Sequence, residues 1–202
     1  DINVTNYPLL TGTVLKASLG SNRTSAQGIV LTTTGLFAWG TSGTILETSL
    51  TGSNDAFHHI VTPTGGDPST GLPSGVTPAN VKMLFTTYQT LAIVTSTGDV
   101  WVLTQAALQL AGNGASGTPS TAQAKTWYKV QTSAGVYLSN VDAVRGQVAD
   151  NTHNALMAVT TSGAIYTWGA STFLGNASAV ASKTYATAMT LPTGVLASDV
   201  KM

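Results

Sequence analysis

The 202-residue sequence contains no cysteine and very little charge. The missing thiols exclude disulfides, thiolate metal sites and cysteine nucleophiles, although they leave the cellular compartment open. Charged residues make up 8% of the chain, about a third of the fraction that is usual for soluble proteins. Eight basic side chains balance eight acidic ones, so the composition has no basic excess for binding nucleic acid. We therefore expect no nucleic-acid partner.

Long apolar runs are also absent. No run approaches the roughly 18 residues that are needed to cross a bilayer, and the chain begins at Asp1 without a basic and then apolar leader. We therefore expect neither a membrane span nor an uncleaved secretory precursor.

Hydroxyl groups and glycine are abundant instead. Ser and Thr make up about a quarter of the chain, which also has 21 Gly and is 43% hydrophobic. This mixture favours strands and turns, so we expect an all-β protein. A cysteine-free, lysine-poor chain rich in Thr, Ser, Gly and Asn is typical of secreted and cell-surface bacterial proteins. The expected location is therefore extracellular, on a bacterial cell surface.

One segment occurs three times at a period of about 60 residues. "LPSGVTPANVKM" at 72–83 returns as "SAGVYLSNVDAV" at 133–144 and as "LPTGVLASDVKM" at 191–202. The glycines Gly75, Gly135 and Gly194 keep register across the copies. A repeat of this length lies in the range of β-propeller blades.

A second repeated element lies between those copies and predicts a hairpin. Its copies are "VLTTTGLFAWG" at 30–40, "IVTSTGDVWVL" at 93–103 and "AVTTSGAIYTWG" at 158–169. In each copy a β-branched stretch leads to a glycine that tolerates positive φ, and aromatic residues follow. These glycines are Gly35, Gly98 and Gly163. Trp39, Trp101 and Trp168 recur at the blade spacing, and we interpret them as packing residues.

Each period accommodates four short strands, which describes one propeller blade. The first strand is expected at 81–85 and 141–145, the second at 90–96 and 155–161, the third at 100–104 and 165–168, and the fourth at 57–62, 127–132 and 185–190. The predicted blades are 13–79, 80–139 and 140–198, with 199–202 beginning a further blade. The Gly/Pro/Ser-rich segments 65–75 and 111–124 are interpreted as blade-rim connections.

These motifs resemble the repeats of the RCC1 family of β-propellers. The third copy is the most similar, with Gly146, His153, "ALMAVTTSG" from Ala155, "IYTWG" ending at Gly169, and "FLGN" at 173–176. Tyr88 and Ser25 stand at the histidine position of the other copies. The resemblance implies that His153 packs at its blade hairpin.

Members of the RCC1 family have seven blades, whereas this sequence contains about three. An open wedge of blades exposes apolar sheet faces and unprotected edges. We therefore predict an incomplete ring, which the remaining blades of a longer chain, or another part of an assembly, would complete.

The sequence contains no recognisable catalytic, cofactor or metal motif. His58 and His59 are adjacent, so on a strand they point to opposite faces. Glu47 is the only glutamate, and the aspartates form no visible pair. No serine lies in a Gly-x-Ser-x-Gly elbow, and "GNGASG" at 112–117 lacks the lysine of a phosphate loop. We therefore predict no enzyme activity, no cofactor and no metal.

Three functional hypotheses follow. The first is a noncatalytic binding or display module of a larger secreted or cell-surface bacterial protein, which contacts a protein or a glycan through its blade loops. The second is a regulatory RCC1-like protein, either an enzyme inhibitor or a GTPase exchange factor. The third is a glycan-active propeller enzyme that uses separated carboxylates.

Overall fold

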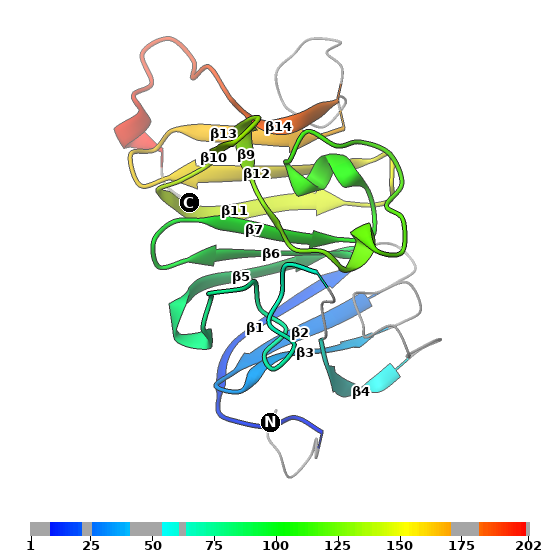
Figure 1. The fold of residues 1–202 in the computed structure, drawn as a ribbon. Coiled ribbons are helices and arrows are strands. Elements are labelled where there is room, and N and C mark those ends of the chain that lie inside the picture. The colour runs from blue at the N-terminus through cyan, green and yellow to red at the C-terminus, as the bar shows by residue number, and fades with distance from the viewer. Residues whose placement is uncertain (1–8, 22–25, 41–53, 61–63, 171–181, 201–202) are drawn as a thin grey trace.

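The chain forms antiparallel β-sheets that are stacked face to face (Figure 1). The structure is a computed structural model, and it describes residues 9–21, 26–40, 54–60, 64–170 and 182–200. Within these ranges there are three four-stranded sheets and one two-stranded sheet, joined by short 3-10 turns. Within the same ranges, no helix has both the length and the apolar character that crossing a membrane requires.

Each four-stranded sheet is a simple meander in which consecutive strands pair. The first sheet consists of β1 (Val14–Ser21), β2 (Ala26–Thr32), β3 (Gly35–Gly40) and β4 (Asn54–His59). The second consists of β5 (Val81–Thr87), β6 (Thr90–Thr95), β7 (Val100–Thr104) and β8 (Tyr128–Lys129). The third consists of β11 (Val141–Val148), β12 (Asn154–Thr160), β13 (Ile165–Gly169) and β14 (Lys183–Ala188).

The remaining elements lie in the connections. The two-stranded sheet is a hairpin of β9 (Gln131–Ser133) and β10 (Val136–Tyr137). Single 3-10 turns precede β5 and end the described chain, as η1 (Pro78–Asn80) and η5 (Ala197–Asp199). Two more, η2 (Leu108–Ala111) and η3 (Gln123–Lys125), lie in the long connection between β7 and β8.

The first strands of the three sheets lie next to one another, as the inner strands of a propeller do. The backbone of Gly20 in β1 lies against Thr86 and Thr87 in β5. On the other side of β5, the hydroxyl of Thr87 accepts a hydrogen bond from the backbone N–H of Val148 in β11 at 3.3 Å. The sheets therefore fan out from a shared inner edge, and their described strands do not close a ring.

The sequence prediction of four strands per repeat is confirmed. The first, second and third strands match their expected positions to within a few residues. The fourth strand departs from its expected position in each sheet. In the second sheet, β8 pairs with β7 through Tyr128 and Lys129 alone. From Gln131 onward the chain turns away to pair with β10 instead. Residues 61–63 of the first predicted copy lie outside the described residues.

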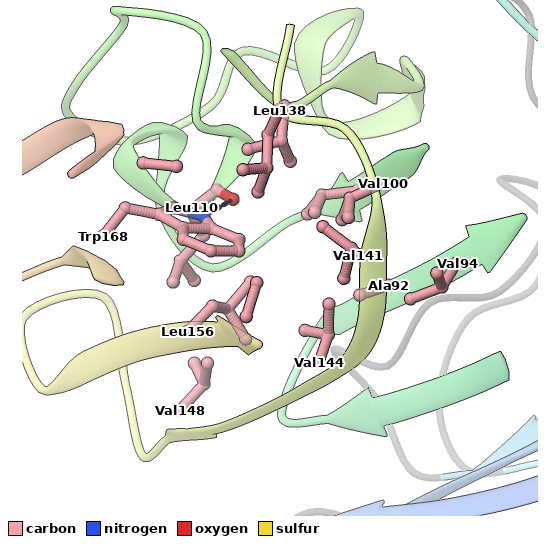
Figure 2. Packing of buried hydrophobic residues seen from close by; sticks show 14 of the residues in the cluster. Ala92, Val94, Val100, Leu110, Leu138, Val141, Val144, Val148, Leu156 and Trp168 are labelled. Atoms are coloured by element: carbon pink, nitrogen blue, oxygen red, sulfur yellow. Dashed lines mark hydrogen bonds between the residues drawn. The ribbon is translucent and has the colours of Figure 1, made fainter. Parts of the chain in front are cut away.

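The hydrophobic core lies between the sheets, and β6 in the middle sheet is buried on both faces. In β6, Leu91 and Ile93 pack with the first sheet, while Ala92 and Val94 pack with the third. Figure 2 shows the second of these interfaces, where Trp168 lies between Leu110 and Leu156. The indole N–H of Trp168 donates to the carbonyl of Leu110 at 2.8 Å. Every buried face therefore requires a neighbouring sheet to cover it.

A Thr-x-x-Gly sequence forms the hairpin between the second and third strands of each sheet. The threonines are Thr32, Thr95 and Thr160, and all three are buried. Their hydroxyls accept hydrogen bonds from backbone N–H groups of the turn at 3.0–3.1 Å. The side chain thus satisfies turn amides that the strand ladder leaves free.

The glycine of each Thr-x-x-Gly turn lies where another segment crosses the hairpin. At Gly98, with φ +81°, a Cβ atom would lie 2.8 Å from the Cα of Asn140, just before the third sheet begins. At Gly35 it would lie 2.5 Å from the carbonyl oxygen of Thr70, and at Gly163 it would overlap Ala197. Glycine is therefore required by contact with the next part of the chain as well as by φ.

The glycines of the other repeated segment share an environment that differs from that of the hairpin glycines. Gly75, Gly135 and Gly194 are exposed, with φ of +81°, +76° and +88°, and no atom lies within 4 Å of a Cβ built on any of them. Gly75 and Gly135 lie in turns before β5 and β11, the first strands of the second and third sheets, and Gly194 lies in a turn between β14 and η5. These positions therefore need glycine for backbone conformation alone.

This difference predicts unequal costs for two glycine substitutions with the same φ. Gly75→Ala should destabilise the chain by about 1–2 kcal/mol, the cost of a left-handed alanine. Gly98→Ala should cost about 1–3 kcal/mol more, because its Cβ also meets the backbone of Asn140. Denaturant unfolding monitored by tryptophan fluorescence measures both variants. Equal destabilisation by the two would contradict the proposed close contact.

Candidate binding site

The three tryptophans that follow the hairpin glycines do not occupy equivalent positions. Trp39 pairs with Gly28 and Trp168 pairs with Leu156, which lie four residues before Thr32 and Thr160. Trp101 pairs with Ile93, only two residues before Thr95. Its counterparts are therefore Phe37 and Tyr166, while Leu103 takes the position of the other two tryptophans. Trp168 is fully buried, whereas Trp101 is half-buried and borders an open groove.

We call this hollow the rim groove, because it lies beside the outer strands β7 and β8 of the second sheet. Its volume is about 520 Å³, within the range of roughly 300–1,000 Å³ that is usual for ligand sites. Aromatic and polar side chains line it: Trp101, Asn113, Trp127, Tyr128, Lys129, Gln131 and Tyr137. Among them, only Trp101 follows a hairpin glycine of the repeat.

Lys129 organises the aromatic part of the rim groove. Its ammonium lies 4.9 Å from the ring centre of Tyr137 and 5.9 Å from that of Trp101. The same ammonium forms an ion pair with Asp99 at 3.0 Å, and both side chains are about a quarter exposed. Cation–π attraction and the ion pair together hold the β9–β10 hairpin beside β7. The aromatic side chains are thereby fixed before any ligand arrives.

Two side-chain amides supply the polar part of the rim groove. The amide oxygen of Gln131 accepts the backbone N–H of Gly135 at 2.9 Å, and that of Asn113 accepts the backbone N–H of Ala115 at 3.2 Å. Among the described residues, neither NH2 group has an acceptor. Both amides therefore present donors to the groove while their acceptors are engaged.

The floor of the rim groove is tied to both neighbouring sheets. The indole N–H of Trp127 donates to the carbonyl of Gly71 at 2.8 Å, in the loop that follows the first sheet. The backbone N–H of Gln131 donates to Gly112 at 2.8 Å, beside the η2 turn that Trp168 contacts. Segments 65–75 and 111–124 therefore serve as structural supports as well as connections, and Leu72 is fully buried.

His153 lies at the turn between β11 and β12, and its side chain is 57% exposed. Its ring Nδ1 lies 2.8 Å from a carboxylate oxygen of Asp150, whose other oxygen accepts hydrogen bonds from the hydroxyl and backbone N–H of Thr152 and from the backbone N–H of His153. These hydrogen bonds, those from Thr152 first, hold the pKa of Asp150 far below its ordinary value. The turn is thus organised by a carboxylate.

The other candidate residues lie apart from the rim groove. His58 and His59 are adjacent in β4, opposite Ala38 and Phe37, and the ring of His59 contacts Phe37 edge-on at 5.2 Å between centres. Within the described part of the chain, no three His, Cys, Asp or Glu side chains are grouped so that they could hold a metal ion. Glu47, Ser25 and the segment 173–176 lie outside the described residues.

The first sheet has a second hollow, on the face directed away from the second sheet. It has a volume of about 360 Å³ and an almost entirely apolar lining that includes Leu19, Val30, Trp39 and Phe57. Leu19 is 69% exposed. In the second and third sheets the equivalents of Val30 are Ile93 and Ala158, and these pack against the preceding sheet. We call this hollow the open face.

Comparison with solved structures assigns the fold. Human WBSCR16 is similar, with a TM-score of 0.57 and 18% identity over 90% of this chain. Prp20, the yeast RCC1, is similar in its complex with Kap60, with a TM-score of 0.60 and 14% identity over 90% of this chain. The chain has an RCC1-like propeller fold. A further structure of Prp20p from Saccharomyces cerevisiae agrees, with a TM-score of 0.57 and 13% identity over 90% of this chain.

The RCC1-like fold of this chain spans 40%, 38% and 39% of the lengths of these three structures, respectively. No protein-family model matches the sequence, and no curated protein is similar to it at the level of sequence. The resemblance of the repeats to the RCC1 family is therefore supported by the fold.

The Asp150 turn predicts a pH dependence of stability. Because the folded state lowers the pKa of this carboxyl, its stabilising contribution is present above the unfolded value of about 4 and is lost as the pH falls below it. In Asp150→Asn, the thermal midpoint should therefore be lower than wild type near neutral pH, and the difference should shrink in acid. A difference that stayed constant between about pH 6 and pH 2 would contradict this assignment.

Proposed function

We propose that this chain is a noncatalytic binding module, a section of an RCC1-like propeller that holds a protein partner at the rim groove. The observation that carries the proposal is the groove itself. It combines partly exposed aromatic side chains, fixed by Lys129, with hydrogen-bond donors that have no described acceptor. Such a combination of rigid aromatic anchors and a few oriented polar groups is typical of binding sites.

The described carboxylates support a noncatalytic role. The five aspartates whose side chains the structure describes are each engaged in a turn or an ion pair: Asp67 with Ser69, Asp99 with Lys129, Asp142 with Lys82, Asp150 with His153 and Asp199 with Leu196. Glycan hydrolysis uses two carboxyl groups on either side of one bond, with different protonation states. Carboxylates that are separately committed to local structure do not form such a pair.

The solved structures of similar fold support a protein partner over a glycan. Prp20 has been solved bound to Kap60, and a second structure of that protein is described together with its binding to Gsp1p and histones. The composition supports a place in a larger secreted or cell-surface bacterial protein, because a lysine-poor chain rich in Thr, Ser, Gly and Asn suits that environment.

We also propose that a further propeller blade covers the open face. The equivalent face of the second sheet is covered by the first, and that of the third sheet by the second. Trp39 occupies the position at which Trp168 binds the loop carbonyl of the preceding sheet. A preceding blade, from a longer chain or a second copy, would supply the same contact.

The open face predicts self-association of the isolated 202-residue chain. Leu19→Asp should weaken that association, because it places a charge in an apolar interface. Val136→Asp, at an exposed position of the β9–β10 hairpin, is the matched control and should have little effect. Sedimentation velocity over a range of concentrations measures both. A wild-type chain that stays monomeric and unfolds in one cooperative transition would overturn the proposal.

The rim groove predicts position-specific capture of a partner. A photo-crosslinking phenylalanine derivative at position 137, which keeps an aromatic ring there, should capture a discrete protein from the surface fraction of the source cells, and excess unlabelled chain should compete. The same residue at Gln147, which is exposed on β11, is the control and should not capture it. Equal capture at both positions, or none at position 137, would remove the support for the groove.

Activity assays on the purified chain distinguish the proposal from the two alternatives. A regulatory protein would change the activity of an enzyme, or speed nucleotide release from a small GTPase, when it is added in purified form. A glycan-active enzyme would release sugar and lose that activity when individual aspartates are replaced. We expect neither effect.

A further inference from the structure

The rim groove has more free hydrogen-bond donors than free acceptors among its side chains. Its available donors are the NH2 groups of Asn113 and Gln131, and the indole N–H of Trp101 also has no acceptor among the described residues. Its acceptors are largely engaged, because both amide oxygens already accept backbone N–H groups. The nearby carboxylate of Asp99 is paired with Lys129. The side chains of the groove therefore offer a ligand more free donors than free acceptors.

This inequality discriminates between classes of ligand. Each hydroxyl of a sugar carries a hydrogen that needs an acceptor, so a glycan requires both kinds of group from its site. The prolines of a proline-rich peptide need donors only, because proline has no N–H and its carbonyls are solvated in the polyproline II conformation. Burying several sugar hydroxyls against a surface with few free acceptors would leave some of them unsatisfied.

The aromatic side chains favour the same ligand. Polyproline II segments bind in grooves lined by aromatic residues, where the flat rings pack against proline and neighbouring donors bind the carbonyls. In the rim groove Trp101, Tyr128 and Tyr137 supply the rings, and Tyr137 is 51% exposed. Lys129 fixes Tyr137 and Trp101 relative to each other, which reduces the ordering cost on binding.

We propose that the rim groove binds a proline-rich peptide segment in the polyproline II conformation. This inference rests on the proposed function, and it names the chemistry of the protein partner. Ring stacking on Tyr137 and Trp101 supplies affinity. The amide groups of Gln131 and Asn113, donating to peptide carbonyls, set the orientation of the segment.

Gln131→Glu is the decisive variant, because it removes a donor from the groove while keeping the turn contact of the hairpin. Glutamate retains the oxygen that accepts the backbone N–H of Gly135, so the β9–β10 hairpin keeps its turn contact. It removes the donor and presents a carboxylate to the peptide carbonyls. Tyr137→Ala removes the most exposed ring, and Val136→Ala truncates the neighbouring exposed side chain of the same strand as a control.

The experiment measures binding of an oligoproline peptide to the 202-residue chain by titration calorimetry, with a Gly/Ser peptide of equal length and maltohexaose as comparison ligands. We expect oligoproline to bind and the Gly/Ser peptide to bind at least about tenfold more weakly. Gln131→Glu should weaken oligoproline binding about three- to tenfold or more, and Tyr137→Ala about tenfold. Val136→Ala should bind like the wild type, and all variants should share its circular dichroism spectrum.

Two outcomes would overturn the inference. One is absence of oligoproline binding, or binding that Gln131→Glu and Tyr137→Ala leave unchanged. The other is binding of maltohexaose that Gln131→Glu leaves unchanged or tightens, which would assign the groove to glycans. If oligoproline fails while the crosslinker at position 137 still captures a protein, the proposed function stands without this ligand. If both fail, both proposals fall.

Discussion

The structure depends on the burial of apolar strand faces between stacked sheets. A strand such as β6, with each of its residues buried, gains stability only when one apolar sheet covers each side. The three sheets therefore stabilise one another in sequence, and the second sheet is the only one of the described three with a neighbour on both faces. The same stacking explains why the hairpin turns contain glycine. Close stacking brings the connecting segments within contact of the turns, so that Gly98 and Gly163 have no room for a side chain.

The rim groove arises where this regular stacking ends. The second sheet has a two-residue fourth strand, and the chain released from it forms the β9–β10 hairpin. That hairpin brings Tyr137 and Gln131 beside Trp101, with Lys129 between the two rings. The shortened edge strand loses strand pairing, and a cation–π cluster and an ion pair hold the released segment in place as part of a binding surface. The shortened fourth strand of the second sheet, a departure from the repeat, thus creates the candidate site.

The sequence predicts the fold well, because the features that repeat are those that the stacking requires. Thr-x-x-Gly turns and β-branched stretches recur at one period, and their positions define the central strands to within a few residues. The groove could not be predicted in the same way. Trp101 follows its glycine at nearly the spacing of Trp39 and Trp168, yet the first hairpin is one residue shorter and the pairing register places Trp101 two positions away. Tyr137 lies in a repeated segment, but its counterparts in the other copies are Thr77 and Leu196, so the repeat does not mark an aromatic position. Lys129 and Gln131 lie in the predicted fourth strand, which is the least regular part of the repeat.

The register also shows that an aromatic residue stands at the position of Trp101 in every described sheet, as Phe37 in the first and Tyr166 in the third. In the first sheet that ring is buried, in contact with His59, and in the second it borders an open groove. The difference comes from what the fourth strand and its following loop place over the ring. A blade of this kind therefore carries a latent platform that needs no change in its core, and new specificities would evolve through the covering segments alone, one blade at a time.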